Sequence, residues 1–150
     1  MVVAVIAILA TLAVPSIQDR LVRQQIVEAV KLADIAKGPV AASWAVSHLL
    51  PIDNAAAGLP VAAKIVSNHV TALRVEDGAI HVTFGNQAYR AINGKTLTLR
   101  PAVVEDAPIV PVAWVCGHAA AVEKMTAKGV DRTDVPVSYL PLNCRAAPAP

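Results

Sequence analysis

The N-terminal segment constrains this chain most, because residues 1–17 (MVVAVIAILATLAVPSI) carry no charge. A helix that is apolar on all sides is buried in lipid or in protein. The segment is a few residues short of the roughly 20 that span a bilayer. It also lacks the basic start of a secretory signal peptide, since no Lys or Arg precedes Arg20. A signal peptide, a membrane helix and the remainder of a longer segment are the three interpretations, and we favour the third.

The next segment, residues 18–50, is typical of an amphipathic helix. Pro15 is expected to kink or locally melt the helix before it, and Gly38-Pro39 to interrupt it again before it ends near Leu49, ahead of Pro51. Apolar and charged residues recur on opposite faces, which predicts a helix half-buried against another layer. The apolar face holds Val22, Ile26, Ala29, Val30, Ala33 and Ala36; the other holds Arg20, Arg23, Lys31 and Asp34. Two pairs are spaced for ion pairing, Glu28 with Lys31 and Asp34 with Lys37.

Beyond a connecting loop at 51–69, the hydrophobic period changes to two, which indicates strands. We predict strands at 70–75, 79–85, 96–103 and 110–116, with turns at Asp77-Gly78 and Asn93-Gly94. The chain after Gly117 is irregular, and its tail 145–150 is expected to be disordered. The predicted fold class is α+β, with a long N-terminal helix packed on a four-stranded antiparallel sheet. The helix takes residues 1–50, with a hydrophobic half at 1–17 and an amphipathic half at 18–50. The head takes 51–150, with strands over 70–116 and a cysteine-bounded region at 116–144.

Two cysteines, Cys116 and Cys144, lie in the C-terminal part of the chain. An even count in a small chain of exported character favours a disulfide. Such a bond would stabilise the fold by roughly 3–4 kcal/mol on the chain-entropy model. The alternative is a pair of unrelated buried thiols.

Several motifs, in order along almost the whole chain, resemble those of type IV pilins. The run MVVAVIAILATLAVPSIQDR resembles the N-terminal pilin helix, and Trp114-Val-Cys116 resembles a motif on the last strand of many pilins. The segments Asp134-Val-Pro136, Tyr139-Leu-Pro141 and Cys144-Arg145 resemble the C-terminal pilin signature. The resemblance implies the pilin fold, with a C-terminal disulfide-bounded loop.

The resemblance departs from the family pattern at the start of the chain. Mature pilins begin with an N-methylated Phe, and a Glu lies in the apolar stretch that follows. A prepilin peptidase removes the basic leader before them. We expect this sequence to lack the leader and the first mature residues, so processing, methylation and the Glu salt bridge cannot be placed on its residues.

The resemblance implies a structural subunit, most simply the fimbrial major subunit of a type IVa-like pilus. Its implied partners are other pilin subunits, the inner membrane before assembly, the pilus assembly machinery, the prepilin peptidase, and host surfaces or DNA. Its implied location is the inner membrane and then an extracellular filament of a Gram-negative bacterium, used for adhesion, twitching motility or DNA uptake. Ala4, Ala7, Ala10 and Ala13 form a small-residue strip that permits close helix packing. The residues expected in helix–helix assembly are Val3, Ala4, Ala7, Ala10, Leu12, Ala13, Val14 and Pro15.

Other chemistry finds little support in the sequence. The histidines, at 48, 69, 81 and 118, lack metal-ligand spacing, and Asp131 and Asp134 favour turns over a calcium site. No nucleophile elbow, phosphate loop or dinucleotide motif is present, so we predict no enzyme, no catalytic residue, no metal and no cofactor. The aromatic residues all follow residue 43, which argues against conduction along the helix.

Two alternatives to the major subunit stay open. One is a low-copy minor pilin that acts as an adhesin or a DNA receptor, although the 117–150 segment has a net charge of only +1 and Tyr139 as its one aromatic residue. The other is an anchored periplasmic binding module that forms no filament.

Overall fold

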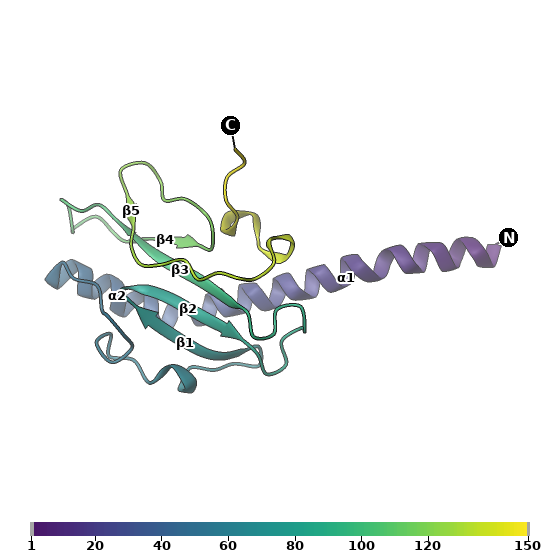
Figure 1. The fold of residues 1–150 in the computed structure, drawn as a ribbon, viewed down its shortest axis with the longest axis horizontal. Coiled ribbons are helices and arrows are strands. Elements are labelled where there is room, and N and C mark those ends of the chain that lie inside the picture. The colour runs from purple at the N-terminus through teal and green to yellow at the C-terminus, as the bar shows by residue number, and fades with distance from the viewer. Residues whose placement is uncertain (1, 150) are drawn as a thin grey trace.

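A long bent helix runs along one face of an antiparallel sheet, and its N-terminal half extends beyond the head (Figure 1). The structure is a computed structural model that describes residues 2–149, without the side chains of 2–5 and 7–16. The helix consists of α1 (Val2–Leu32) and α2 (Asp34–Ser47). This arrangement confirms the predicted α+β fold.

The head-facing side of the helix is a regular stripe of small and branched apolar residues. The predicted face is confirmed except at Val30, which is half-buried. Alanines occupy three positions of the stripe, and their short side chains let the helix backbone lie close to the sheet. The stripe continues along α2 at the same three- and four-residue spacing. Its buried members are Val22, Ile26, Ala29, Ala33, Ala36, Val40 and Trp44.

The helix is interrupted at one place, and it is not where the sequence predicts. Pro15 lies within α1, so the predicted local melting there is wrong. Gly38 and Pro39 lie inside α2, and the break falls at Ala33 instead. The N–H of Ala36 bonds to the Ala33 carbonyl, three residues back, at 3.0 Å. Pro39 removes an N–H and crowds the carbonyl of Ile35, four residues earlier, so the break at Ala33 lies two residues before the position that the proline affects directly.

Five strands form the sheet, one more than predicted. They are β1 (Val70–Glu76), β2 (Ala79–Phe84), β3 (Thr96–Val103), β4 (Ala113–Cys116) and β5 (Thr126–Ala127). The order is β1-β2-β3-β4, and β5 also pairs with β3. All pairings are antiparallel. The turn between β1 and β2 is as predicted, with Asp77 and Gly78 both at positive φ, 49° and 82°.

The fourth strand is shorter than predicted. Residues 110–112 lie outside β4, which begins at Ala113. Pro111 has no N–H to give to a sheet ladder, so the strand forms only after it.

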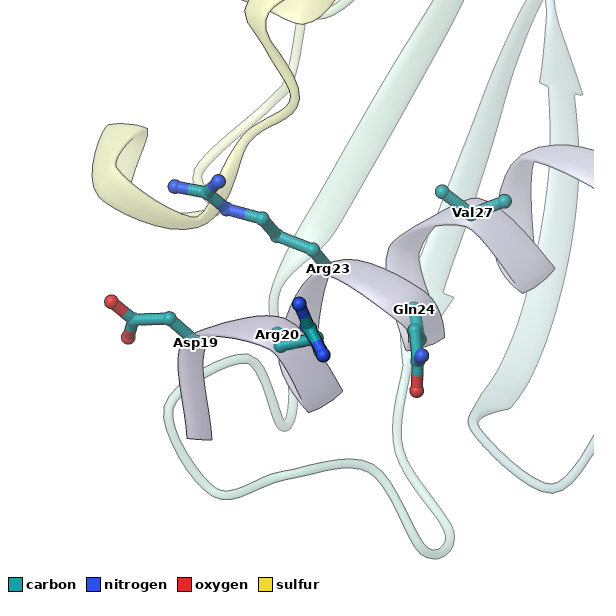
Figure 2. Close-up of a pocket in the computed structure, with 5 residues that line it drawn as sticks. All are labelled: Asp19, Arg20, Arg23, Gln24 and Val27. Carbon is teal, nitrogen blue, oxygen red and sulfur yellow. The ribbon is translucent and has the colours of Figure 1, made fainter. Parts of the chain in front are cut away.

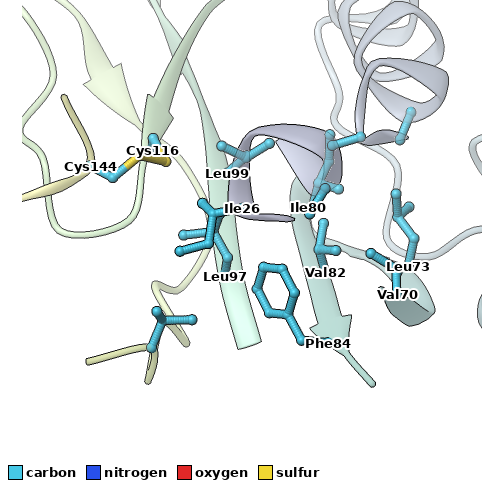
Figure 3. Close-up of a cluster of buried hydrophobic side chains, with 14 of the residues drawn as sticks. Ile26, Val70, Leu73, Ile80, Val82, Phe84, Leu97, Leu99, Cys116 and Cys144 are labelled. Atoms are coloured by element: carbon cyan, nitrogen blue, oxygen red, sulfur yellow. A yellow bond between two sulfur atoms is a disulfide. The ribbon is translucent and has the colours of Figure 1, made fainter. Parts of the chain in front are cut away.

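The two faces of the sheet have different characters because side chains alternate along each strand. Inward-facing residues such as Leu73, Val82 and Leu97 meet Ile26 of α1 in the core (Figure 3). The opposite face carries Arg74, His81 and Thr98 in neighbouring register positions. The core thus fixes the helix on one face and leaves a polar face on the other.

Candidate functional site

The N-terminal half of α1 leaves the head and runs free of it (Figure 1). Of its described side chains, Ile6 is 61% exposed and Ile17 57%, and Leu21, where the helix meets the head, is 50% exposed. Exposed apolar residues on a helix that has left its own core form a surface with no partner inside the chain. The predicted assembly residues lie on this half, but their side chains fall outside the described ones: Val3, Ala4, Ala7, Ala10, Leu12, Ala13, Val14 and Pro15.

The described part of the chain contains no helix that is both long enough and apolar enough to cross a membrane.

A hollow of about 500 Å³ lies along α1 near the point where the helix meets the head. Figure 2 shows Arg23 extending from α1 toward the C-terminal segment, while Asp19 points away from the rest of the helix. Val27 and Gln24 line the hollow as well, so its wall is part apolar and part charged.

Three polar residues of α1 hold three separate loops. Arg23 donates from Nη2 to the Ser138 carbonyl at 3.3 Å. Gln25 accepts from the N–H of Tyr89 at 2.9 Å. Glu28 pairs with Nδ1 of His69 at 2.8 Å, so the predicted Glu28–Lys31 pair is wrong. The contact partners of the helix are thus distant in sequence, which spacing along the helix cannot reveal. The second predicted pair, Asp34–Lys37, is confirmed at 2.7 Å.

The predicted disulfide joins Cys116 at the end of β4 to Cys144 near the C-terminus, with Cα atoms 4.5 Å apart. The N–H of His118 donates to the Cys144 carbonyl at 3.0 Å. Gly117, between them, has φ of +54°, and a Cβ there would lie 2.6 Å from the same carbonyl oxygen. Only glycine fits such a close approach with a left-handed backbone.

The segment 131–134 pairs with the first half of β3 through side chains rather than as a strand. Asp134 accepts from the N–H of Thr96 at 2.5 Å and returns its own N–H to the Thr96 carbonyl. Thr133 accepts from the N–H of Thr98 at 3.0 Å. These bonds give hydrogen-bond partners to the backbone of β3 beyond the end of β4. The two aspartates, which were predicted to form turns, therefore hold a segment against this edge of the sheet.

Asp131 holds this segment through both carboxylate oxygens. One accepts from the N–H of Thr133 at 3.0 Å, and the other lies 2.8 Å from Nδ1 of His118. Burial opposes the ionisation of Asp131, but the hydrogen bonds from Thr133 and His118 outweigh it, so its pKa lies below the ordinary value.

The outer face of the sheet carries a charged cluster that the sequence does not predict. Arg132 pairs with Glu76, and this hydrogen bond lowers the pKa of Glu76. His81 is 5% exposed, with Nδ1 2.8 Å from the Thr98 hydroxyl. Burial lowers the pKa of His81. The alternation of residues along β1 and β2 predicts which side chains lie on this outer face. The position of Arg132 beside Glu76 cannot be predicted in this way, because the two residues are distant in sequence.

The histidines stay apart from one another in the fold: His48 caps α2, and the other three have the different partners given above. Among residues 2–149, no group of three or more metal-ligating side chains gathers.

A long helix that extends from a disulfide-closed α+β head is the architecture of one class of protein, the bacterial filament subunit. Comparison with known proteins places the chain in that class. Residues 22–145 match the family model for pilin, a bacterial filament protein. The chain belongs to the pilin family, which confirms the predicted resemblance to type IV pilins.

Relatives match over nearly the full length. The fimbrial protein EcpC of Eikenella corrodens is 32% identical, over 99% of this chain and 87% of its own length. The type IV major pilin protein PilE of Neisseria gonorrhoeae is 31% identical, over 96% of this chain and 87% of its own. A fimbrial protein of Neisseria meningitidis serogroup B is 28% identical, over 97% and 89%.

Family membership gives the general role. The chain is a structural subunit of an extracellular pilus of a Gram-negative bacterium, where its partners are other pilin subunits. The pilin family is a structural family rather than an enzyme family.

Proposed function

We propose that this chain is the major subunit of a type IVa-like pilus and polymerises through the N-terminal half of α1. The observation that carries the proposal is the exposure of Ile6 and Ile17 on a helix that has left the head. Residues 1–17 form the filament core, 18–50 carry the head, and 51–150 form the outer surface. The core contacts come from Val3, Ala4, Ala7, Ala10, Leu12, Ala13, Val14 and Pro15.

The N-terminal half of α1 lies first in the membrane and then in the filament. Before assembly it lies in the inner membrane, and the prepilin peptidase and the pilus assembly machinery act on it there. Lipid and a helix bundle are both apolar, so transfer between them changes the free energy little, and close packing of small residues favours the bundle. This balance supports a filament that extends and retracts, as adhesion, twitching motility and DNA uptake require.

A matched pair of variants tests polymerisation. Ile17→Asp places a charge on the extending helix, where Ile17 is 57% exposed, and Val46→Asp places the same charge on α2, where Val46 is 85% exposed. We expect Ile17→Asp to lower the amount of this pilin in sheared filaments at least tenfold at unchanged total protein, because a charge buried in the filament core without a partner is costly. Val46→Asp should leave the amount of pilin in sheared filaments within twofold of that of the unsubstituted chain. Equal filament yields from both variants would overturn the proposal.

Copy number separates the major subunit from the low-copy minor pilin that acts as an adhesin or DNA receptor. The mass and amount of this chain in the sheared filaments should make it the main component. A trace amount beside a different main subunit would favour the minor pilin. The N-terminal residue in the same fraction tests processing by the peptidase.

A further inference from the structure

A cavity of about 280 Å³ lies on the outer face of the sheet, on the side opposite α1. Its polar walls come from β1, β2, β3 and the crossing segment that carries Arg132. Ala62 and Ala72 also line it, and their single methyl groups leave the space open. The six polar residues that line it are Arg74, Glu76, His81, Thr83, Thr96 and Arg132.

His81 is a buried group in this wall with a ring nitrogen left over. Its Nδ1 lies 2.8 Å from the Thr98 hydroxyl, which already accepts the N–H of Arg132 at 3.0 Å. The Thr98 hydroxyl can donate to Nδ1 or accept from it, so Nε2 is correspondingly a hydrogen-bond donor or an acceptor. Nε2 is buried and has no hydrogen-bond partner among the described residues. A buried ring nitrogen without a partner is costly, so a ligand hydroxyl, which can both donate and accept, recovers free energy when it pairs with Nε2.

The charges of the cavity select a monoanion. Arg132 is neutralised by Glu76, whereas Arg74 is exposed and makes no ion pair within the described part of the chain. One positive charge is left, which one carboxylate balances and pairs with in fork geometry. A phosphate dianion would add a second negative charge beside Glu76 and be repelled by it.

The remaining groups select hydroxyls on the ligand. The side-chain hydroxyls of Thr83 and Thr96 line the cavity, and each can both donate and accept. The carboxylate of Glu76 can accept from a ligand hydroxyl while it pairs with Arg132. A small compact group with one carboxylate and several hydroxyls satisfies the cavity.

We propose that this cavity binds a carboxylated sugar of the uronic acid type, free or as a residue of a polysaccharide. The carboxylate lies on Arg74, one ring hydroxyl pairs with Nε2 of His81, and the others lie against Thr83, Thr96 and Glu76. The proposal does not depend on polymerisation, so the unassembled chain tests it.

The test measures binding of D-glucuronate to the full chain in detergent micelles by calorimetry and by ligand-observed NMR. We expect saturable binding that weakens at least tenfold in Arg74→Gln, because a charge-assisted contact is lost. Thr83→Val, which keeps the strand-forming branched side chain, should weaken it about threefold. Arg90→Gln is the matched control, since Arg90 is also exposed and lies outside the cavity; binding there should stay within twofold. Far-UV circular dichroism checks that the variants fold.

The other probes decide the chemistry and its source. Glucose and inorganic phosphate should bind at least tenfold more weakly than glucuronate. A hyaluronan octasaccharide that binds tenfold more tightly than glucuronate identifies a polysaccharide as the source, and equal affinity identifies the single sugar. The proposal is overturned if neither glucuronate nor the hyaluronan octasaccharide binds saturably, or if phosphate or glucose binds as tightly as glucuronate. It is also overturned if Arg90→Gln weakens glucuronate binding as much as Arg74→Gln does.

Discussion

At the scale of single residues, His81 is the side chain whose charge the fold controls most directly. Burial lowers its pKa below the ordinary value of 6.5. Glu76 works against this shift, while the nearby guanidiniums of Arg132 and Arg74 add to it. The folded protein therefore keeps the imidazole neutral at a pH where the unfolded chain has begun to bind a proton.

This difference predicts that acid destabilises the head through His81. The unfolded chain takes up the proton first as pH falls, so the contribution is fully present above pH 6.5 and is lost as pH falls toward the folded pKa. The free energy of unfolding from urea titrations should decline between pH 7 and pH 5. His81→Asn, which removes the titrating group, should flatten that slope.

His48→Asn is the control for the same experiment. His48 ends α2 with φ of 59°, a left-handed conformation that Asn also tolerates. It is exposed, and its replacement should leave the pH slope as it is in the unsubstituted chain. If the free energy of unfolding changes with pH in the same way in the unsubstituted chain, His81→Asn and His48→Asn, His81 does not cause the acid destabilisation.

At the scale of elements, the packing of α1 on the sheet predicts a sharp contrast between adjacent residues. Ile26 is fully buried against the sheet, whereas Val27 is 48% exposed. Ile26→Ala should lower the free energy of unfolding by about 3 kcal/mol, since it leaves a cavity between two layers. Val27→Ala should cost less than about 1 kcal/mol. Chemical denaturation measures both, and similar losses would contradict the observed packing.

The disulfide predicts a further loss of stability at this scale. It ties the irregular chain after β4 back to the end of that strand. The double variant Cys116→Ser with Cys144→Ser should lose roughly 3–4 kcal/mol, because the unfolded chain gains the freedom that the cross-link removes. Adding reductant should lower the unfolding midpoint of the parent chain and leave that of the double variant unchanged. A parent midpoint that ignores reductant would refute this role.

The elements also show what local sequence can predict. The stripe from Val22 to Ala36 and the Asp77-Gly78 turn are predictable because periodicity and turn chemistry are local properties. The break at Ala33 is not, because neither Gly38 nor Pro39 lies at it and the carbonyl that Pro39 crowds is that of Ile35. The two-residue strand β5 is too short to show a period at all.

At the scale of the whole molecule, three polar side chains of α1 hold loops of the head to the helix. These polar anchors are Arg23, Gln25 and Glu28. Gln25→Ala should cost about 1 kcal/mol, because the half-buried N–H of Tyr89 loses its acceptor. Gln24→Ala is the adjacent control, since Gln24 is exposed, and it should change the free energy of unfolding by less than about 0.5 kcal/mol. Equal effects would mean that the Tyr89 contact contributes nothing to the fold.

In the candidate site, too, the features that depend on local sequence are predictable and those that depend on distant residues are not. The extending apolar helix and the disulfide follow from residues 1–17 and from the two cysteines. The anchors of Arg23, Gln25 and Glu28 do not, because their partners lie 41 to 115 residues away along the chain. Arg132 reaches Glu76 across a separation of 56 residues. Such pairs form only when the whole fold is complete.

The positions of the three anchors have a mechanical consequence. In the filament that we propose, tension runs along the α1 helices, and the force enters each head through its own α1. Arg23, Gln25 and Glu28 lie within two turns of that helix but hold three different loops. The load on the head is thus shared by attachments to three different loops in addition to the buried stripe of the helix. The cross-link at Cys144 prevents the last segment from peeling away once its own attachment yields.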